Sequence, residues 1–346
     1  MSSIPEDIYR EILLRLPVES LLVCKCICKN WYALITSSDF VSTHITVQEK
    51  NPILILDNYI SNVLYSIGYD SLLASSVCDI IEMDYPFKSD STSPRLLGVC
   101  NGLASLWLSV LDYKYKSEWP ISWNTVCFWN PATREYKEIP KSPYAFKLHH
   151  ISLHAFGYDC KTNDYKLIIG VDARLSEHTT LVQVYTLASN SWKIGKTVPY
   201  LFQHDKIPKV LVNGDLHWLG IAQGNLFLLS LDISDESFKE IELPKEFSEK
   251  DKDLMSLGEL EGCISVLVFS LVNGVKSHIE VWVMLDYGVL ESWSKHHAID
   301  YSNSIFTGLE HSRLVRSFEN GEILFLSGDG LLLYDPKHGG GRYIKT

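Results

Sequence analysis

The sequence predicts a small all-α helical module followed by an all-β propeller. The spacing of apolar residues changes near position 46, from the helical period of about 3.6 residues to the two-residue alternation of strands. Beyond that point a unit of roughly 50 residues recurs, and this length matches a four-stranded propeller blade. We expect about six blades, with five or seven as alternatives. A large β-sandwich with coincidental turns is the competing fold.

Residues 4–35 carry the signals of helices. Pro5 suits the first turn of a helix, because that turn needs no N–H from it. Apolar residues then recur at four-residue spacing on one face: Ile8, Ile12 and Leu16. Pro17 ends this helix and can begin the next one. The sequence therefore predicts two helices, the second over residues 18–35.

This second predicted helix is apolar around most of its circumference. At 100° per residue, one stripe contains Cys24, Cys28, Trp31 and Ile35, and another contains Val23, Ile27 and Leu34. Cys26 falls on the side opposite Cys24, so the three clustered thiols do not converge as zinc ligands would, and we predict no metal site. A module of ~40 residues is too small to bury so much apolar surface alone. We therefore expect a partner, inside or outside the chain, to cover the rest.

From about residue 52, short apolar or alternating runs are separated by Gly, Asn, Asp and Pro, which is typical of strands and tight turns. A turn followed by a strand recurs in CNGLASLW (100–107), VNGDLHWL (212–219), LEGCISVL (260–267) and ENGEILFL (319–326). One aromatic residue follows the later turn of each unit: Tyr136, Trp192, Phe238, Trp293 and Tyr343. Residues 52–93 have the length of a further blade with a degraded motif. We place the helical module at 1–46 and the propeller at 47–346.

The composition favours a folded chain and argues against several partners. The chain is 46% hydrophobic and has a formal net charge of −11. A negative surface repels phosphate backbones, so we expect no nucleic-acid partner. No run reaches the ~20 apolar residues of a membrane helix, and the acidic N-terminus lacks the layout of a signal peptide. We therefore expect no membrane insertion, a cytoplasmic or nuclear location, and reduced thiols.

The first 45 residues resemble an F-box. The family pattern has a Leu-Pro start, a helix ending Glu-Ile-Leu-x-Arg-Leu-Pro, and a second helix with Cys-x-Cys-Lys-x-Trp and a late Phe. The matching residues are Pro5, Glu11, Ile12, Leu13, Arg15, Leu16, Pro17, Leu21, Cys26, Cys28, Lys29, Trp31 and Phe40. Ile4 replaces the usual Leu, and Cys24 stands where a bulky apolar residue is common.

Residues 52–346 resemble the plant F-box-associated domain, which is related in architecture to kelch propellers. The resemblance rests on WNPATREYKEIP (129–140), FGYDCKTNDYKL (156–167), NSWK (190–193), NGDLHWL (213–219) and VWVMLDYGVLESW (281–293). Within this family the chain is similar to receptors that act in immune-receptor turnover and to S-locus-type pollen receptors. The sequence does not separate these two kinds.

The resemblance implies a function. F-box proteins bind an SKP-family adaptor, which links them to a cullin, a RING subunit and a ubiquitin-conjugating enzyme, while their other domain binds a protein substrate. The chain would then be the substrate-recognition subunit of an SCF ubiquitin ligase. It would act by proximity, without catalysis of its own and without a cofactor. The alternatives are an F-box receptor outside a ligase and a propeller enzyme, since some kelch-like propellers host metal or radical chemistry.

Two sets of residues are candidates for these contacts. For the adaptor surface we select Pro5, Ile8, Leu16, Pro17, Leu22, Val23, Ile27 and Leu34, some of which could instead belong to the core of the module. For the substrate surface we select the aromatic residues of the insertion at 109–124: Tyr113, Tyr115, Trp119 and Trp123. Exposed aromatic residues on loops often anchor partners. The alternative is that Trp119 and Trp123 pack on their own blade.

Overall fold

The computed structural model describes residues 5–48, 53–58, 61–73, 80–111, 121–143, 151–172, 179–202, 210–249, 254–272, 275–300, 313–327 and 330–345. The chain divides into two compact units, residues 1–139 (unit 1) and residues 140–346 (unit 2).

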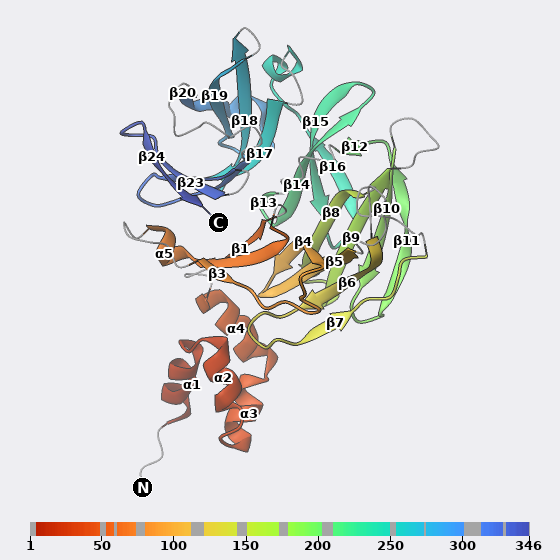
Figure 1. Ribbon diagram of the computed structural model, residues 1–346, viewed down its shortest axis with the longest axis vertical. Coiled ribbons are helices and arrows are strands. Elements are labelled where there is room, and N and C mark those ends of the chain that lie inside the picture. The colour runs from red at the N-terminus through yellow and green to blue at the C-terminus, as the bar shows by residue number, and fades with distance from the viewer. Residues whose placement is uncertain are drawn as a thin grey trace. The chain divides into compact units, whose positions relative to one another are not determined.

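Unit 1 begins with four helices, drawn in red and orange-red in Figure 1: α1 (Glu6–Leu14), α2 (Val18–Cys24), α3 (Lys29–Ile35) and α4 (Ser38–Gln48). Pro5 and Pro17 precede α1 and α2, as their missing N–H groups predict. Helix α4 was not predicted from the sequence. The boundary expected at residue 46 falls inside it, two positions before its last residue.

The prediction of one helix over residues 18–35 is wrong, because the chain leaves the helix between α2 and α3. The N–H groups of Cys26 and Ile27 bond to carbonyls three residues back, which tightens and ends α2. Cys28 then has an extended backbone, with φ −158° and ψ 163°, and its Sγ accepts the N–H of Trp31 at 3.5 Å. Cys28 thus takes the place of an N-cap residue. The predicted stripe of Cys24 with Cys28 does not form.

The remaining elements are mainly strands. They are β1 (Ile53–Asn58), β2 (Val63–Gly68), β3 (Ile80–Glu82), β4 (Thr92–Cys100), β5 (Leu103–Leu111), β6 (Ile121–Trp129), β7 (Tyr136–Glu138), β8 (Ile151–Asp159), β9 (Asp164–Asp172), β10 (Thr180–Thr186), β11 (Ser191–Val198), β12 (Leu201–Phe202), β13 (Val210–Val212), β14 (Asp215–Ala222), β15 (Asn225–Asp232), β16 (Ser237–Ile241), β17 (Met255–Leu260), β18 (Cys263–Val272), β19 (Val275–Met284), β20 (Trp293–Asp300), β21 (Arg313–Ser317), β22 (Ile323–Ser327), β23 (Gly330–Asp335) and β24 (Gly340–Lys345). Short helices interrupt them: α5 (Tyr69–Leu73), η2 (Lys245–Glu249) and η4 (Leu290–Ser292).

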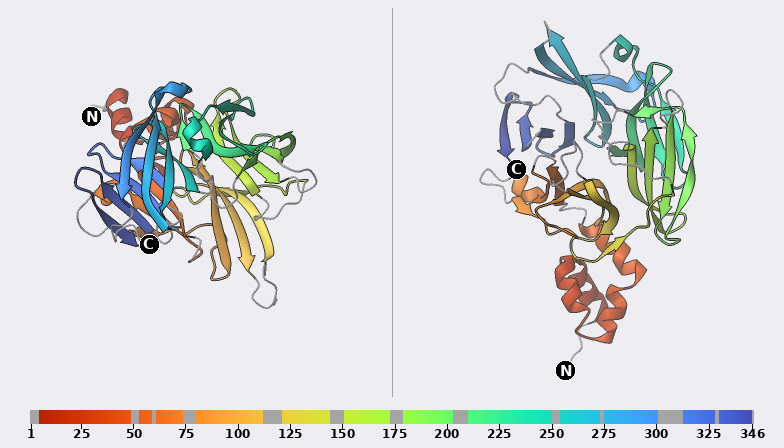
Figure 2. Two further views of the ribbon diagram at one scale, coloured as in Figure 1. Left: turned by 90° about the horizontal axis from the view of Figure 1, so that it is seen from above. Right: turned by 45° about the vertical axis from the view of Figure 1, so that its right-hand side comes forward.

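The described strands form six antiparallel sheets, each from neighbouring strands of the sequence. Unit 1 contains the sheets β1-β2-β3 and β4-β5-β6-β7. Unit 2 contains β11-β10-β9-β8, β17-β18-β19-β20, β21-β22-β23-β24 and β12-β14-β15-β16, the last with β13 paired to β14. Figure 2 shows the strands of these sheets from two further directions. The predicted fold is confirmed: a small helical module precedes a six-bladed β-propeller.

The recurring turns have the backbone that their sequence predicts. Asn101 and Gly102 join β4 to β5 with φ angles of 50° and 76°, and Asn213 and Gly214 join β13 to β14 with 54° and 83°. Two consecutive residues with positive φ are what a type I′ hairpin turn requires, and Asn-Gly satisfies this at little steric cost. These turns therefore set the register of each hairpin.

The recurring aromatic residues lie on the fourth strand of their sheets, which are β7, β11, β16, β20 and β24. Trp293 shows what the position does: its Nε1 donates to the carbonyl of Glu242 at 3.4 Å, directly after the last strand of the preceding sheet. Trp192 donates in the same way to the carbonyl of Pro140 at 2.6 Å. At these two positions the indole therefore links the fourth strand of a sheet to the segment that precedes this sheet in the chain.

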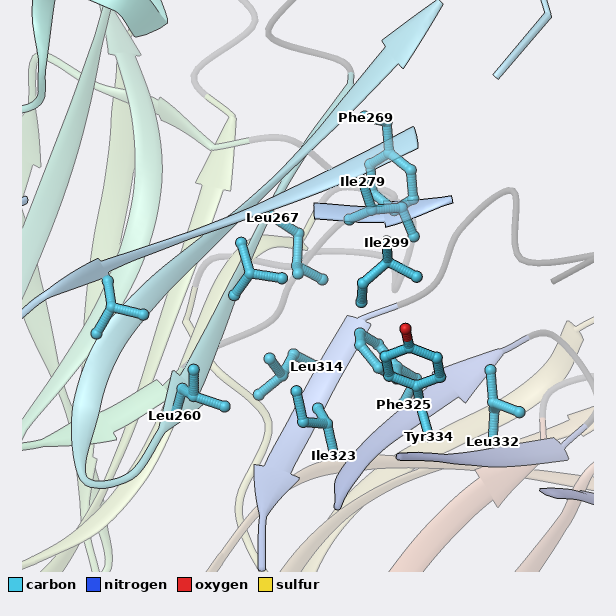
Figure 3. Close-up of a cluster of buried hydrophobic side chains, with 12 residues drawn as sticks. Leu260, Leu267, Phe269, Ile279, Ile299, Leu314, Ile323, Phe325, Leu332 and Tyr334 are labelled. Carbon is cyan, nitrogen blue, oxygen red and sulfur yellow. The ribbon is translucent and has the colours of Figure 1, made fainter. Parts of the chain in front are cut away.

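Apolar side chains fill the space between neighbouring sheets of unit 2. Leu267, Phe269 and Ile279 from β18 and β19 pack against Leu314 and Phe325 from β21 and β22, as Figure 3 shows. All five are buried. Comparable clusters lie between the sheets β12–β16 and β17–β20 and between β8–β11 and β12–β16. Each of these sheets is therefore covered by apolar contacts on a face that it turns to a neighbour.

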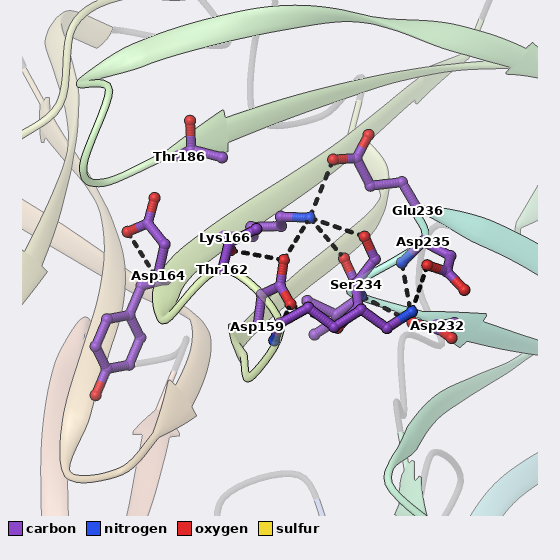
Figure 4. Close-up of polar contacts among 12 residues, drawn as sticks. Asp159, Thr162, Asp164, Lys166, Thr186, Asp232, Ser234, Asp235 and Glu236 are labelled. Carbon is purple, nitrogen blue, oxygen red and sulfur yellow. Dashed lines mark hydrogen bonds and ion pairs between the residues drawn. The ribbon is translucent and has the colours of Figure 1, made fainter.

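A buried ion cluster also joins β8 and β9 to the turn between β15 and β16 (Figure 4). The side chains of Lys166 and Asp159 are 6% and 1% exposed, and Lys166 Nζ lies 3.0 Å from Asp159 Oδ2 and 3.2 Å from Glu236 Oε1. The same ammonium donates to the carbonyls of Ile233 and Ser234, each at 3.1 Å. Ser234 Oγ donates to Asp159 at 2.6 Å. Every charge in this cluster therefore has partners, as burial demands.

Candidate functional site

The helices α1 to α4 enclose a small core of their own. Its buried members are Leu13, Leu14, Leu21, Ile35 and Phe40, and its half-buried members are Tyr9, Leu16, Cys24, Trp31 and Leu34. Trp31 lies beside Tyr9, with 6.0 Å between the ring centroids. The core uses one side of each helix, so the other sides are left for solvent or a partner.

Large apolar side chains lie exposed on the outer sides of α1, α2 and α3 and on the turn between α2 and α3. Val23 and Ile27 are 68% and 61% exposed, and Ile8 is 52% exposed. Ile12 and Tyr32 are exposed to a similar degree. A helical module with this many uncovered apolar side chains has the surface of a protein-binding element.

The residues predicted for adaptor binding divide into two groups by burial. Five are exposed: Pro5, Ile8, Pro17, Val23 and Ile27. Three are half-buried: Leu16, Leu22 and Leu34. Leu16 and Leu34 pack against the core of the helical module. Their role in adaptor binding stays a prediction for both groups.

The sequence reasoning missed exposed apolar residues on the same helices. Ile12 lies one helical turn after Ile8 in α1, and that spacing was the available signal. Tyr32 lies in α3 and was not among the residues that the sequence analysis selected. Val41 is exposed on α4, which was not predicted.

Polar contacts fix α4 against the first helices. The carbonyl of Leu16, after α1, accepts His44 Nε2 at 2.9 Å and Gln48 Nε2 at 3.3 Å, both from α4. Arg10 of α1 also forms an ion pair with Asp39 of α4 at 2.7 Å. These bonds satisfy a carbonyl that the end of α1 leaves without a helical partner. They hold the Leu16–Pro17 corner in place.

The thiols near the turn between α2 and α3 are not arranged as metal ligands. Cys26 and Cys28 are exposed, Cys24 is half-buried, and all three are free cysteines. Cys26 Sγ donates to the carbonyl of Leu22 at 3.7 Å, and Cys28 Sγ caps α3. Within the part of the chain that the structure describes, no group of three His, Cys, Asp or Glu side chains could hold a metal ion.

The aromatic residues predicted for substrate binding belong to the connection between β5 and β6 and to β6 itself. Tyr113, Tyr115 and Trp119 lie outside the described residues. Trp123 lies in β6, opposite Val110 of β5. It is therefore a strand residue and not part of a loop, which corrects one element of that prediction.

None of the helices among the described residues combines the length and the apolar composition needed to cross a bilayer.

Two family models match the chain. The model "F-box domain" matches residues 1–43, and the model "F-box associated beta propeller domain" matches residues 118–326. The first match covers the exposed apolar surface of α1 to α3. The second covers the sheets from β6 to β22, more than half of the chain.

Two relatives align with nearly the whole chain. "F-box protein CPR1" of Arabidopsis thaliana is 28% identical over 97% of this chain and 82% of its own. "F-box protein At3g07870" of the same plant is 28% identical over 98% of this chain and 86% of its own. Among solved structures, an exo-beta-1,3-galactanase from Clostridium thermocellum aligns with 72% of this chain and 57% of its own at 10% identity, with a TM-score of 0.40. The two family matches and the Arabidopsis relatives show that the chain belongs to the plant F-box proteins with an F-box associated beta propeller domain.

Proposed function

We propose that the chain is the substrate-recognition subunit of an SCF ubiquitin ligase. The observation that carries this proposal is the exposed apolar surface of α1 to α3, with Val23 and Ile27 as its most exposed members. An SKP-family adaptor is the partner that would cover it, because this surface lies within the F-box match. The adaptor would connect the chain to a cullin, a RING subunit and a ubiquitin-conjugating enzyme.

In this proposal the chain carries out no bond chemistry. The propeller binds a target protein, and the adaptor holds the complex near the conjugating enzyme. The local concentration of target lysines rises, and transfer of ubiquitin becomes effectively intramolecular. The adaptor contacts would be made by Pro5, Ile8, Leu16, Pro17, Leu22, Val23, Ile27 and Leu34. The aromatic residues of 113–123 remain candidates for substrate contacts.

The adaptor assignment is tested by Ile27→Asp with Ile194→Asp as a matched control. Both isoleucines are 61% exposed, one on the turn after α2 and the other on β11. A buried aspartate at the adaptor contact is strongly unfavourable, so we expect Ile27→Asp to lose adaptor co-purification by more than about tenfold. Ile194→Asp should retain it.

Three outcomes separate the possibilities. Adaptor and cullin that co-purify with the wild-type chain, and are both lost in Ile27→Asp, support the ligase subunit. Adaptor without cullin favours an F-box receptor outside a ligase. Equal retention by the two variants contradicts the assignment of this surface.

A further inference from the structure

The segment between β19 and η4 presents apolar side chains to solvent. Leu285 and Val289 are 52% and 44% exposed, and Tyr287 between them is 38% exposed. They alternate with Asp286 and Gly288, so three apolar groups lie within five residues. Isolated exposed apolar residues are common on proteins, but such a concentration on one turn is not.

Hydrogen bonds hold this turn in one conformation. Leu285 N donates to the carbonyl of Ser292 at 3.3 Å, and Val289 N donates to the carbonyl of Asp286 at 3.0 Å. Ser292 Oγ donates to the same Asp286 carbonyl at 2.9 Å. Gly288 supplies the positive φ of 78° that the turn needs. A turn fixed before binding loses little conformational entropy when a partner arrives.

Tyr287 ties the turn to the neighbouring sheet. Its hydroxyl lies 2.8 Å from Nε2 of His217, a fully buried residue of β14. His217 Nδ1 lies 3.2 Å from the carbonyl of Val210, so Nδ1 carries the proton and Nε2 accepts from Tyr287. The two rings meet edge to face at 5.6 Å. The position of the turn is therefore set by β14 as well as by its own backbone.

An apolar pocket begins where the turn ends. It has a volume of about 300 Å³, and its lining includes Phe227, Phe247 and Leu290 together with the charged residues Glu240, Glu242 and Lys245. Leu290, which lines the pocket, directly follows Val289 in the chain, so the pocket adjoins the exposed turn at this residue. This volume is at the lower end of the range for ligand pockets and accepts one large side chain.

The charges around this surface are mostly negative. Glu240, Glu242, Asp286 and Glu291 are exposed, and none of them pairs with a described cation within 4.0 Å, while Lys245 is the basic residue of the pocket. Glu240 Oε1 accepts the hydroxyl of Tyr200 at 2.7 Å, which fixes that carboxylate at the pocket. The surface is thus complementary to a segment that carries both apolar and basic side chains.

We propose that the turn 285–290 and the adjoining pocket, together called the acidic-apolar surface, bind an extended segment of the substrate protein. This segment would place one large apolar side chain in the pocket and a neighbouring Lys or Arg against Glu240 and Glu242. The proposal rests on the proposed role as a substrate receptor and names the chemistry of the substrate. Its strongest contacts come from the apolar anchor, and the carboxylates select basic neighbours.

The probe is a short fluorescein-labelled peptide with a central Leu-Phe pair flanked by lysines, titrated with the full chain bound to its adaptor and followed by anisotropy. Two further peptides replace the lysines by glutamates or the Leu-Phe pair by alanines. We expect both replacements to weaken binding by at least about tenfold. Glu242→Lys should weaken binding of the lysine peptide about tenfold, and the matched change Glu319→Lys should leave it unchanged.

Leu285→Ser together with Val289→Ser removes apolar contacts without a change of charge, and Leu211→Ser is the control on an exposed residue of β13. The double variant should lose binding and the control should retain it. Equal binding of the lysine and glutamate peptides overturns the proposal, as does equal weakening by the paired variants. A wild-type dimer that the double variant dissociates shows a second copy as the occupant and also overturns it. If these peptide tests fail while adaptor and cullin still co-purify with every variant, the inference about this surface has failed and the receptor role has not.

Discussion

Two sheets of unit 2 carry different buried side chains at the same position of their second strand, where each sheet meets its neighbour. One side chain is charged and the other is neutral. The third residue of β9 is Lys166 and the third residue of β14 is His217, and both side chains are buried. Each reaches a turn that follows the third strand of the next sheet. Lys166 binds two carboxylates there and in β8, whereas His217 binds the hydroxyl of Tyr287 as a neutral ring.

A third sheet has neither a lysine nor a histidine at this position. The corresponding residue of β18 is Ser265, which is fully buried and whose Oγ has no hydrogen-bond partner among the described residues. The junction of that sheet with β21–β24 is built mainly from apolar contacts (Figure 3), and one hydrogen bond, from the N–H of Glu261 to Ser317 Oγ at 2.7 Å, also crosses it. The comparison teaches that the propeller repeat fixes the burial of this position, while the partners across the junction are specific to each pair of sheets. The energy of breaking each junction should differ accordingly.

The largest effect is expected at the charged junction. Lys166→Met removes the cation and leaves Asp159 and Glu236 without it in a buried site, which should lower the free energy of unfolding by about 3–5 kcal/mol. The control is Lys161→Met, because Lys161 pairs with Asp235 at the exposed surface of the same junction. That variant should lose much less stability, because solvent screens an exposed ion pair. Denaturant unfolding of the full chain measures both, and equal losses would contradict the importance of burial.

The deficit of Lys166→Met should shrink in acid. Burial alone raises the pKa of Asp159, but hydrogen bonds from Ser234, Lys166 and Thr162 outweigh it and hold that pKa well below its ordinary value. Because the folded pKa is lowered, the carboxylate stabilises the wild-type fold above the unfolded pKa of about 3.9, and this contribution is lost as the pH falls through the folded pKa. Without the ammonium, Asp159 accepts a proton more readily. The unfolding curves of the wild type and Lys166→Met should therefore be well separated at neutral pH and should approach each other below about pH 4.

The stability that the neutral ring of His217 contributes should begin to fall at a higher pH than that of the Lys166 cluster. Burial lowers the pKa of His217, although Val210 and Asp215 act in the opposite direction. The unfolded ring takes up a proton near pH ~6.5 while the buried ring does not, so stability is present above that pH and falls as the pH is lowered. The slope reaches at most about 1.4 kcal/mol per pH unit.

His217→Gln tests this contribution, with His338→Gln as the control on an exposed histidine. We expect the His217 variant to lose less stability than the wild type between about pH 7 and pH 5.5. His297, whose pKa burial and His296 also lower, supplies a pH dependence that all three proteins share. If the wild type and His217→Gln have the same slope, the neutral ring is not the cause.

The fold could be predicted from the sequence where the signals were local. Asn-Gly turns such as 213–214 and the aromatic of the fourth strand recur with the period of a blade, so the sheets were found. The break between α2 and α3 was missed because no Gly or Pro marks it, and the cap is an unusual one, the thiol of Cys28. The angular positions of one continuous helix were therefore applied across two helices, and this placed Cys24 and Cys28 on one stripe.

The contacts across the junctions were not predictable in this way. Lys166 lies in an apolar strand pattern, and strands β10 to β15, which belong to two sheets, separate it from its partner Glu236 in the sequence. The acidic-apolar surface was missed for the same reason, since Leu290 joins residues from β15, β16 and η2 only in the folded chain. Exposure of Val23 and Ile27, in contrast, followed from a surplus of apolar residues in a module too small to bury them.

The smallest effect is expected for Tyr287→Phe, which removes one hydroxyl from the neutral junction and keeps the ring. His217 Nε2 then loses the O–H that it accepts at 2.8 Å, so the free energy of unfolding should fall by about 1 kcal/mol. Tyr136→Phe is the control, because Tyr136 is 51% exposed. Its loss should be close to zero, since water replaces whatever an exposed phenol binds. A Tyr287→Phe loss as large as that of Lys166→Met would show that the two junctions do not differ in kind, because one neutral hydrogen bond would then stabilise the fold as much as a buried cation.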